Sequence, residues 1–164
     1  MKKLVLVLFS IYSLTQVSFA QEIKTDKYCK KIDVEVDKFN GETKYQTPIL
    51  KQLGKKQIFF TKIIKNGEET VYMNISTNGS TPSTGNGVTI LLDNGEKIEK
   101  NTKTDVRVNS NAQFEHSAFF RLTKADIDLL KKHNITDTKI YVFEMSIVNP
   151  IQYRAFMICL DEKK

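Results

Sequence analysis

The stretch "QIFFTKIIKNGEETVYMNIS", residues 57–76, decides the fold class. Side chains on both sides of its centre fall into two alternating sets, as in β-strands with two different faces. Asn66 and Gly67 separate the two runs, and this pair favours a tight hairpin because both turn positions need a positive φ. The stretch therefore predicts an antiparallel hairpin. In the first run Ile58, Phe60 and Ile64 alternate with Phe59, Thr61 and Ile63, and in the second Val71, Met73 and Ile75 alternate with Tyr72, Asn74 and Ser76.

Similar patterns extend outward from this hairpin. In "KIDVEV", residues 31–36, Ile32, Val34 and Val36 share one side, which predicts a half-solvated strand. A second Asn-Gly pair, in "LLDNGEKI", predicts a second hairpin with Asp93 and Glu96 flanking the turn and pointing into solvent. Further strands are predicted at "TDVRVNS", "QFEHSAFFRL", "TKIYVFEMSIV" and "QYRAFMICL". The last two carry apolar residues on both faces, which indicates central or doubly covered strands.

One segment, "LTKADIDLLKKHNIT", does not show the two-residue alternation of a strand. Thr123 is placed as an N-cap with Asp126 three residues later, a capping box. Basic residues fill the last turn, where positive charge suits the helix dipole, and Asn134 suits a left-handed stop. The prediction is one helix from Lys124 to His133.

The pattern as a whole predicts a mainly β (α+β) protein: a single domain, an antiparallel β-sandwich or barrel-like sheet of seven or more strands, with one short helix at about residues 123–133. The domain would span residues 21–164, because residues 1–20 have the basic, apolar and small-residue regions of a secretory signal peptide. We expect cleavage between Ala20 and Gln21 and a periplasmic or secreted product. The apolar run is shorter than the roughly 20 residues of a membrane span, and none is expected in the mature chain.

Cys29 and Cys159 are the chain's two cysteines. In an exported protein such a pair favours one disulfide, which would place the first and last strands side by side; two buried thiols are the alternative. Neither cysteine has the neighbours of a catalytic thiol.

Composition and motifs exclude several classes of function. Lysines are scattered among acids, arginine is scarce and the chain is expected to be exported, so nucleic acid is not an expected partner. The two histidines, His116 and His133, show no zinc spacing, and no nucleophile motif accompanies them. His116 fits a hydrogen-bonded core position. The acids around Gly95 could hold calcium, but their spacing suits a turn better than a metal loop. No catalytic residue, metal or cofactor is expected.

Three segments carry a resemblance: "DKFNGETKYQTP" (37–48), "GVTILLDNGEKI" (87–98) and "RLTKADIDLLKKHNITDTKIYVFE" (121–144). Their D-x-F-x-G-E, L-D-N-G-E and L-T-x-x-D-I-x-x-L-K-K patterns resemble an uncharacterised family of small exported, signal-peptide-bearing proteins of the Bacteroidota. The shared motifs are turn and cap signatures, so the resemblance implies kinship of fold and brings no catalytic or binding residues.

The function expected from the sequence is that of a non-catalytic module that binds a protein, peptide or envelope component. Tyr72, Phe119 and Tyr153, taken as exposed on a sheet face, or the loop Asn78 to Gly87, would form its contact surface. A small carboxylate-dependent hydrolase and a small-lipid carrier are the alternatives. The hydrolase would need an acid pair in a cleft, and the carrier an internal apolar cavity.

Overall fold

The computed structural model describes residues 23–52, 55–56, 58–109 and 111–164, so the predicted signal segment and its cleavage point lie outside the described residues. In chain order the elements are α1 (Asp26–Cys29), β1 (Asp33–Asp37), β2 (Glu42–Gln46), β3 (Lys51–Gln52), β4 (Lys55–Lys56), β5 (Ile58–Lys65), β6 (Glu68–Gly79), β7 (Asn86–Leu92), β8 (Lys97–Lys103), β9 (Asp105–Val108), β10 (Phe114–Arg121), α2 (Lys124–Lys132), β11 (Ile135–Ile140), β12 (Phe143–Ser146) and α3 (Pro150–Asp161).

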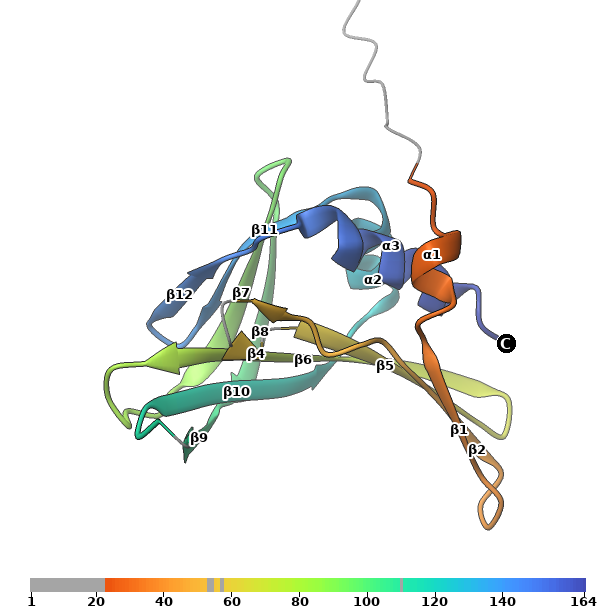
Figure 1. Ribbon diagram of the computed structural model, residues 1–164, viewed down its shortest axis with the longest axis horizontal. Helices are drawn as coiled ribbons and strands as arrows, with labels where there is room; N and C mark the ends of the chain where they lie inside the picture. The colour runs from red at the N-terminus through yellow and green to blue at the C-terminus, as the bar shows by residue number, and fades with distance from the viewer. Residues whose placement is uncertain (1–22, 53–54, 57, 110) are drawn as a thin grey trace, which may run out of the picture.

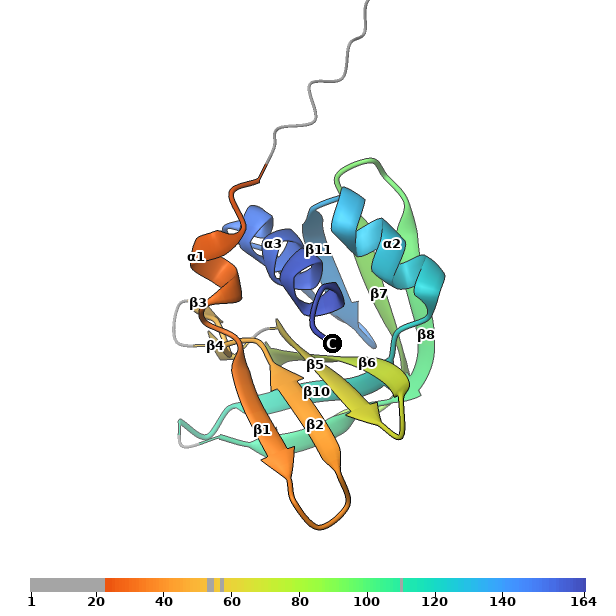
Figure 2. The same cartoon turned by 90° about the vertical axis from the view of Figure 1, so that its right-hand side faces the viewer.

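Two antiparallel sheets dominate the fold, and the mainly β prediction is confirmed. One has six strands in the order β1-β2-β5-β6-β10-β9, and the other has four in the order β12-β11-β7-β8, with a small β3-β4 hairpin beside them. The sheets approach each other where β10 meets β8 and where β12 meets β6. The three helices of the described residues lie on one side of the six-stranded sheet, and within these residues no helix covers its opposite, outer face (Figures 1 and 2).

The two predicted Asn-Gly hairpins are both present, with different turns. Asn66 and Gly67 both have positive φ, 53° and 80°, and join β5 to β6 as a two-residue turn. At the second hairpin only Gly95 is left-handed, with φ 85°, and Leu92 rather than Asp93 lies opposite Glu96, through a 3.0 Å bond from Leu92 N to Glu96 O. The extra loop residue frees Asp93 to contact the end of α2, which corrects the expected solvent-facing pair.

Helix α2 has the predicted start. The Thr123 side chain accepts from Asp126 N, and the Asp126 carboxylate accepts from Thr123 N, which completes the capping box. The end differs from the prediction: His133 is already extended, with φ −120° and ψ 150°, and Asn134 is not left-handed. The chain therefore passes directly from the helix into β11.

The C-terminal segment corrects the sequence prediction most clearly. "QYRAFMICL" was predicted to be a strand, but it forms helix α3, which begins at Pro150 after Asn149 in a left-handed conformation. The segment "TKIYVFEMSIV" forms not one strand but the hairpin β11–β12, which turns at Tyr141 and Val142. The fold therefore has two helices, α1 and α3, in addition to the predicted one.

The core lies between the inner faces of the two sheets, with α3 packed against both β5 and β11. Both sheets and α3 contribute fully buried side chains, which pack together and exclude water from the interior. These side chains are Phe60, Met73, Ile75, Ile90, Ile140, Tyr153, Phe156 and Met157. A hydrophobic core of this composition provides the main stabilising free energy of the fold.

The predicted disulfide between Cys29 and Cys159 is present. It joins α1 to α3, so the expectation that it would connect neighbouring first and last strands was wrong. Tyr28 packs its ring edge against Phe156 beside it, with ring centroids 5.3 Å apart. Among the described residues, no helix is long and apolar enough to cross a membrane.

Candidate functional site

The outer face of the six-stranded sheet carries a group of aromatic side chains, which we call the aromatic face: Phe59 on β5, Tyr72 on β6 and Phe119 on β10. The register places Asn74 between Phe59 and Phe119, and Tyr72 lies diagonally from Phe119. The Tyr72 and Phe119 rings are stacked, with centroids 4.8 Å apart and an interplanar angle of 12°. Phe119 is 53% exposed, although it is a large apolar residue on a regular strand.

Two hollows lie on this outer face. One, of about 240 Å³, adjoins Phe59 and Asn74 and is bounded by Ile49 on one side and by Arg107 and Glu115 on the other. The second, of about 460 Å³, lies toward the β5–β6 turn and includes Tyr72 among its lining residues. The aromatic face is therefore a shallow, uneven surface with apolar rings near its middle and charged side chains at its margins.

Of the three predicted surface residues, two are brought together and one is not. Tyr72 and Phe119 are in direct contact on the open face, a contact that the sequence did not indicate. Tyr153 was placed wrongly, because its segment is a helix: it lies in α3 with 1% of its surface exposed. Ile49, which extends the apolar surface and is 39% exposed, was not identified, because it lies in a segment without a regular period.

The loop Asn78 to Gly87 is shorter than predicted. Strand β6 continues to Gly79 and β7 begins at Asn86, which leaves Ser80 to Thr84 as the exposed part. The His116 ring holds this loop through a 3.0 Å hydrogen bond between Nε2 and Thr81 O. His116 is fully buried and packs against Phe143, with ring centroids 4.2 Å apart, so it is the hydrogen-bonded core residue that was expected.

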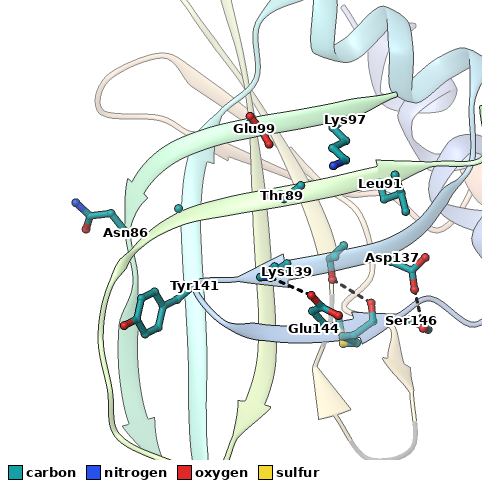
Figure 3. A pocket seen from close by; sticks show the side chains of 13 residues that line it. Asn86, Thr89, Leu91, Lys97, Glu99, Asp137, Lys139, Tyr141, Glu144 and Ser146 are labelled. Carbon is teal, nitrogen blue, oxygen red and sulfur yellow. Dashed lines mark hydrogen bonds and ion pairs between the residues drawn. The ribbon is translucent and has the colours of Figure 1, made fainter. Parts of the chain in front are cut away.

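A second concave surface lies on the four-stranded sheet and measures about 580 Å³; we call it the polar groove (Figure 3). Lys97 and Glu99 line it from β8, Thr89 and Leu91 from β7, and charged residues from β11 and β12. Lys139 donates to Glu144 at 2.9 Å, and Ser146 donates to Asp137 at 2.6 Å, across the two neighbouring strands. These bonds pair four polar side chains of the groove with one another.

Tyr141 stands at one end of the polar groove (Figure 3). Its φ of 55° is unusual for a bulky residue and marks the tip of the β11–β12 hairpin. The loop before β7 and the start of β7 accommodate it. Tyr141 N donates to Gly87 O at 2.9 Å, and the Tyr141 ring lies directly against Gly85, where a β-carbon would clash with it. Any larger residue at position 85 would displace the ring.

The acids around Gly95 take part in the structure of the turn. Asp93 accepts a 2.7 Å bond from Asn134 Nδ2, and its other oxygen lies 3.3 Å from His133 Nδ1. Glu96 accepts from Asn94 Nδ2 at 2.9 Å. Within the described part of the chain, no group of three or more histidine, cysteine or acidic side chains is placed to hold a metal ion.

Asp126, at the start of α2, makes three short polar contacts through one carboxylate oxygen. Its Oδ2 accepts from Lys100 Nζ at 2.5 Å and from Thr123 N and Oγ1, both at 2.6 Å. Burial alone would raise the pKa of Asp126, but the hydrogen bonds from Lys100 and Thr123 outweigh it and hold that pKa below its ordinary value. A carboxyl group of this kind is kept ionised and serves to join α2 to β8.

Comparison of the chain with protein-family models, with curated proteins and with solved structures finds no match in any of the three.

Proposed function

We propose that this chain is an exported, non-catalytic binding module that recognises a protein or peptide through the aromatic face. The observation that carries the proposal is the stacked Tyr72–Phe119 pair, which lies on a sheet face that no helix of the described segments covers and leaves Phe119 53% exposed. Exposed rings surrounded by polar groups are typical of interaction surfaces, since aromatic residues provide large contact areas with little loss of side-chain entropy.

The surroundings of the pair support a macromolecular partner. Ile49 and Phe59 continue the apolar surface, while Arg107 and Glu115 provide charges of both signs at its edge. An apolar centre with a polar margin is the usual composition of a protein interface. The disulfide between α1 and α3 fits an oxidising compartment outside the cytoplasm, in agreement with the predicted signal segment.

The polar groove and the interior give less support to the other two functions. A hydrolase would use two carboxyl groups facing a substrate, and in the groove Asp137 and Glu144 each already hold a side-chain partner. A lipid carrier would use an apolar space between the sheets, and there the fully buried Tyr153, Phe156 and Met157 of α3 fill the interior.

The proposal is tested by capture from envelope extract with wild-type protein and with Phe119→Ala and Tyr72→Ala. The matched control is Phe39→Ala, because Phe39 is fully exposed but lies on another part of the surface, at the β1–β2 turn. We expect partners bound by wild type and by Phe39→Ala to be lost from the two aromatic-face variants. With the purified partner, each substitution should weaken binding by about tenfold or more, the effect of a central interface residue.

Thermal unfolding separates binding from folding in this test. Since both rings are at least partly exposed, the two variants should unfold within a few degrees of wild type. Equal capture by all four proteins, or capture lost only together with folding, would contradict the proposal.

A further inference from the structure

Strand β1 is an open edge of the six-stranded sheet. Among the described residues it pairs with β2 alone, and the β1–β2 hairpin extends away from the helices and the second sheet (Figures 1 and 2). Its five residues pair with β2 without any shift of register. The strand contains no proline and no bulge, two features that block an edge, while its three acids discourage pairing with an uncharged or acidic strand.

The two faces of β1 have opposite chemistry. Val34 and Val36 lie on the same side as Tyr45 of β2, but beyond the region that the helices and second sheet cover, so they are 54% and 58% exposed. This corrects the sequence prediction of a half-buried strand, of which only Ile32 is buried. The other side carries three acids, Asp33, Glu35 and Asp37, and of these Glu35 has a loose ion pair with Lys44 at 3.6 Å.

The charge pattern decides which kind of strand fits this edge. In an antiparallel pair of two copies centred on Glu35, Glu35 would face its own counterpart and Asp33 would face Asp37. Like charges directly opposite one another destabilise a strand pair, and a shift by one residue would set the valines against the acidic side. A strand with lysine or arginine on one face and β-branched residues on the other would instead complement both sides of β1.

We propose that β1 binds an extended segment of a partner protein, in which basic residues alternate with β-branched apolar residues, as an added seventh strand of the sheet. Main-chain hydrogen bonds to the free edge would provide affinity, and the two faces would provide specificity. The basic side chains would lie against Asp33, Glu35 and Asp37, and the apolar ones would cover Val34 and Val36. This edge is separate from the Tyr72–Phe119 pair, so it is a second interaction surface in addition to the proposed function.

The test uses three labelled synthetic peptides with the full mature protein, at low and at physiological salt. One alternates lysine and valine, a second contains the same residues as a lysine block and a valine block, and a third alternates glutamate and valine. Fluorescence anisotropy should show the lysine–valine alternating peptide binding at least tenfold more tightly than the other two. A version of that peptide with alternate N-methylated residues, which cannot form one row of main-chain bonds, should bind at least tenfold more weakly.

Variants of the protein define the surface. The triple change Asp33→Lys, Glu35→Lys and Asp37→Lys should reverse the preference, so that the glutamate–valine peptide binds more tightly. Val34→Ser with Val36→Ser should weaken binding at least tenfold without changing thermal unfolding, because both valines are already exposed. Phe119→Ala should leave peptide binding unchanged, which distinguishes failure of this proposal from failure of the proposed function.

Three outcomes would overturn the inference. Equal binding of the alternating and block peptides would mean that β1 is only an acidic patch. Unaltered preference in the triple lysine variant would place the binding elsewhere. Light scattering that finds a dimer of the wild type, dissociated by Val34→Ser with Val36→Ser, would assign the edge to a second copy.

Discussion

At the scale of single residues, Asp126 combines two roles that are usually separate. It closes the capping box of α2 through Thr123 and pairs with Lys100 of β8, so one carboxylate joins the start of a helix to the four-stranded sheet. The T-x-x-D spacing allowed the first role to be predicted from local sequence. The second could not be predicted, because Lys100 and Asp126 approach each other only after β8 and α2 have packed together.

Replacement of Asp126 by Asn should lower the free energy of unfolding by about 1–3 kcal/mol at pH 7, because charge-assisted bonds become neutral and Lys100 loses its counter-ion. The pKa of Asp126 is lowered in the folded protein, so its contribution to stability is present above the ordinary value of 3.8 and disappears as pH falls below it. The difference between wild type and Asp126→Asn, measured by urea unfolding, should therefore shrink between pH 5 and about pH 3.

Asp128→Asn is the matched control for this change, since it alters a neighbouring acid of the same helix outside the capping box. It should change stability by no more than about 0.5 kcal/mol. A difference between wild type and Asp126→Asn that stays constant down to pH 3 would show that the carboxylate is not the source of the stabilisation.

Tyr153 gives a second prediction at this scale. Its hydroxyl is buried and has no hydrogen-bond partner within the described residues, and burial raises its pKa to about 12; Gln152 opposes the rise without completing a hydrogen bond. Tyr153→Phe removes an unsatisfied polar group and should leave stability unchanged or raise it by up to about 1 kcal/mol. Tyr153→Ala should cost about 3–5 kcal/mol, because it leaves a cavity.

The pH dependence follows from the raised pKa of Tyr153. Its neutral form stabilises the folded protein, and this contribution is lost as pH rises from the ordinary value of 10.0 toward 12. Denaturant titrations between pH 9 and about pH 11 should therefore show a smaller loss of stability for Tyr153→Phe than for wild type. An identical loss in both proteins would mean that other groups determine the alkaline unfolding.

At the scale of elements, α3 shows why a buried helix is difficult to identify from one sequence. Most of its residues are apolar because α3 contacts two sheets and two helices, and a short, mainly apolar run has the same pattern as a doubly covered strand. Asn149 and Pro150 suit a turn between two strands equally well, but proline is also favoured in the first turn of a helix, which is its place here. The two Asn-Gly hairpins were easier to predict, because their turns depend only on neighbouring residues, whereas the β11–β12 hairpin has no such turn signal.

The candidate surfaces also differ in whether neighbouring residues or the packing of distant segments determine them. Tyr72 and Phe119 could be named as candidates from their places in alternating strands, but their stacking depends on the pairing of β6 with β10. The polar groove could not be foreseen, since it depends on the pairing of β7 with β11, which are far apart in the sequence. The exposure of Val34 and Val36 also depends on the whole fold, because no local signal indicates that the core ends before the tip of the β1–β2 hairpin.

Lys62 connects the end of α3 to the six-stranded sheet. It is almost completely buried, and its Nζ donates to Lys163 O at 2.6 Å and to Asp161 O at 3.4 Å while it lies 2.7 Å from Glu69. Lys62→Met would remove these bonds and leave carbonyl groups at the helix end without a donor. Chemical denaturation should show a loss of about 2–4 kcal/mol.

Lys44→Met is a suitable control for Lys62→Met, because its ion pair with Glu35 is exposed and longer, at 3.6 Å. It should cost less than about 1 kcal/mol. Equal losses in the two variants would mean that the buried contacts of Lys62 with α3 contribute little to stability.

At the scale of the whole molecule, the Cys29–Cys159 disulfide closes most of the chain into one covalent loop. The disulfide joins residues 130 positions apart and fastens α1, which leads into the β1 edge, to α3 in the core. In addition to the covalent bond, α1 contacts α3 through the edge-on packing of Tyr28 against Phe156. None of the α1 residues is fully buried, so this short helix is attached to the core through the disulfide and the partly buried Tyr28.

The double variant Cys29→Ala with Cys159→Ala should therefore be less stable than wild type by about 4–5 kcal/mol, because the unfolded chain regains the freedom of a very long loop. In the folded variant, α1 should open locally more often than the rest of the protein. Limited trypsin digestion should then cleave first at Lys24, Lys27, Lys30 or Lys31, before any site in the sheets. A stability loss below about 1 kcal/mol, or first cleavage within the β5–β6 hairpin, would mean that noncovalent contacts alone hold α1, and that the disulfide does not position the β1 edge.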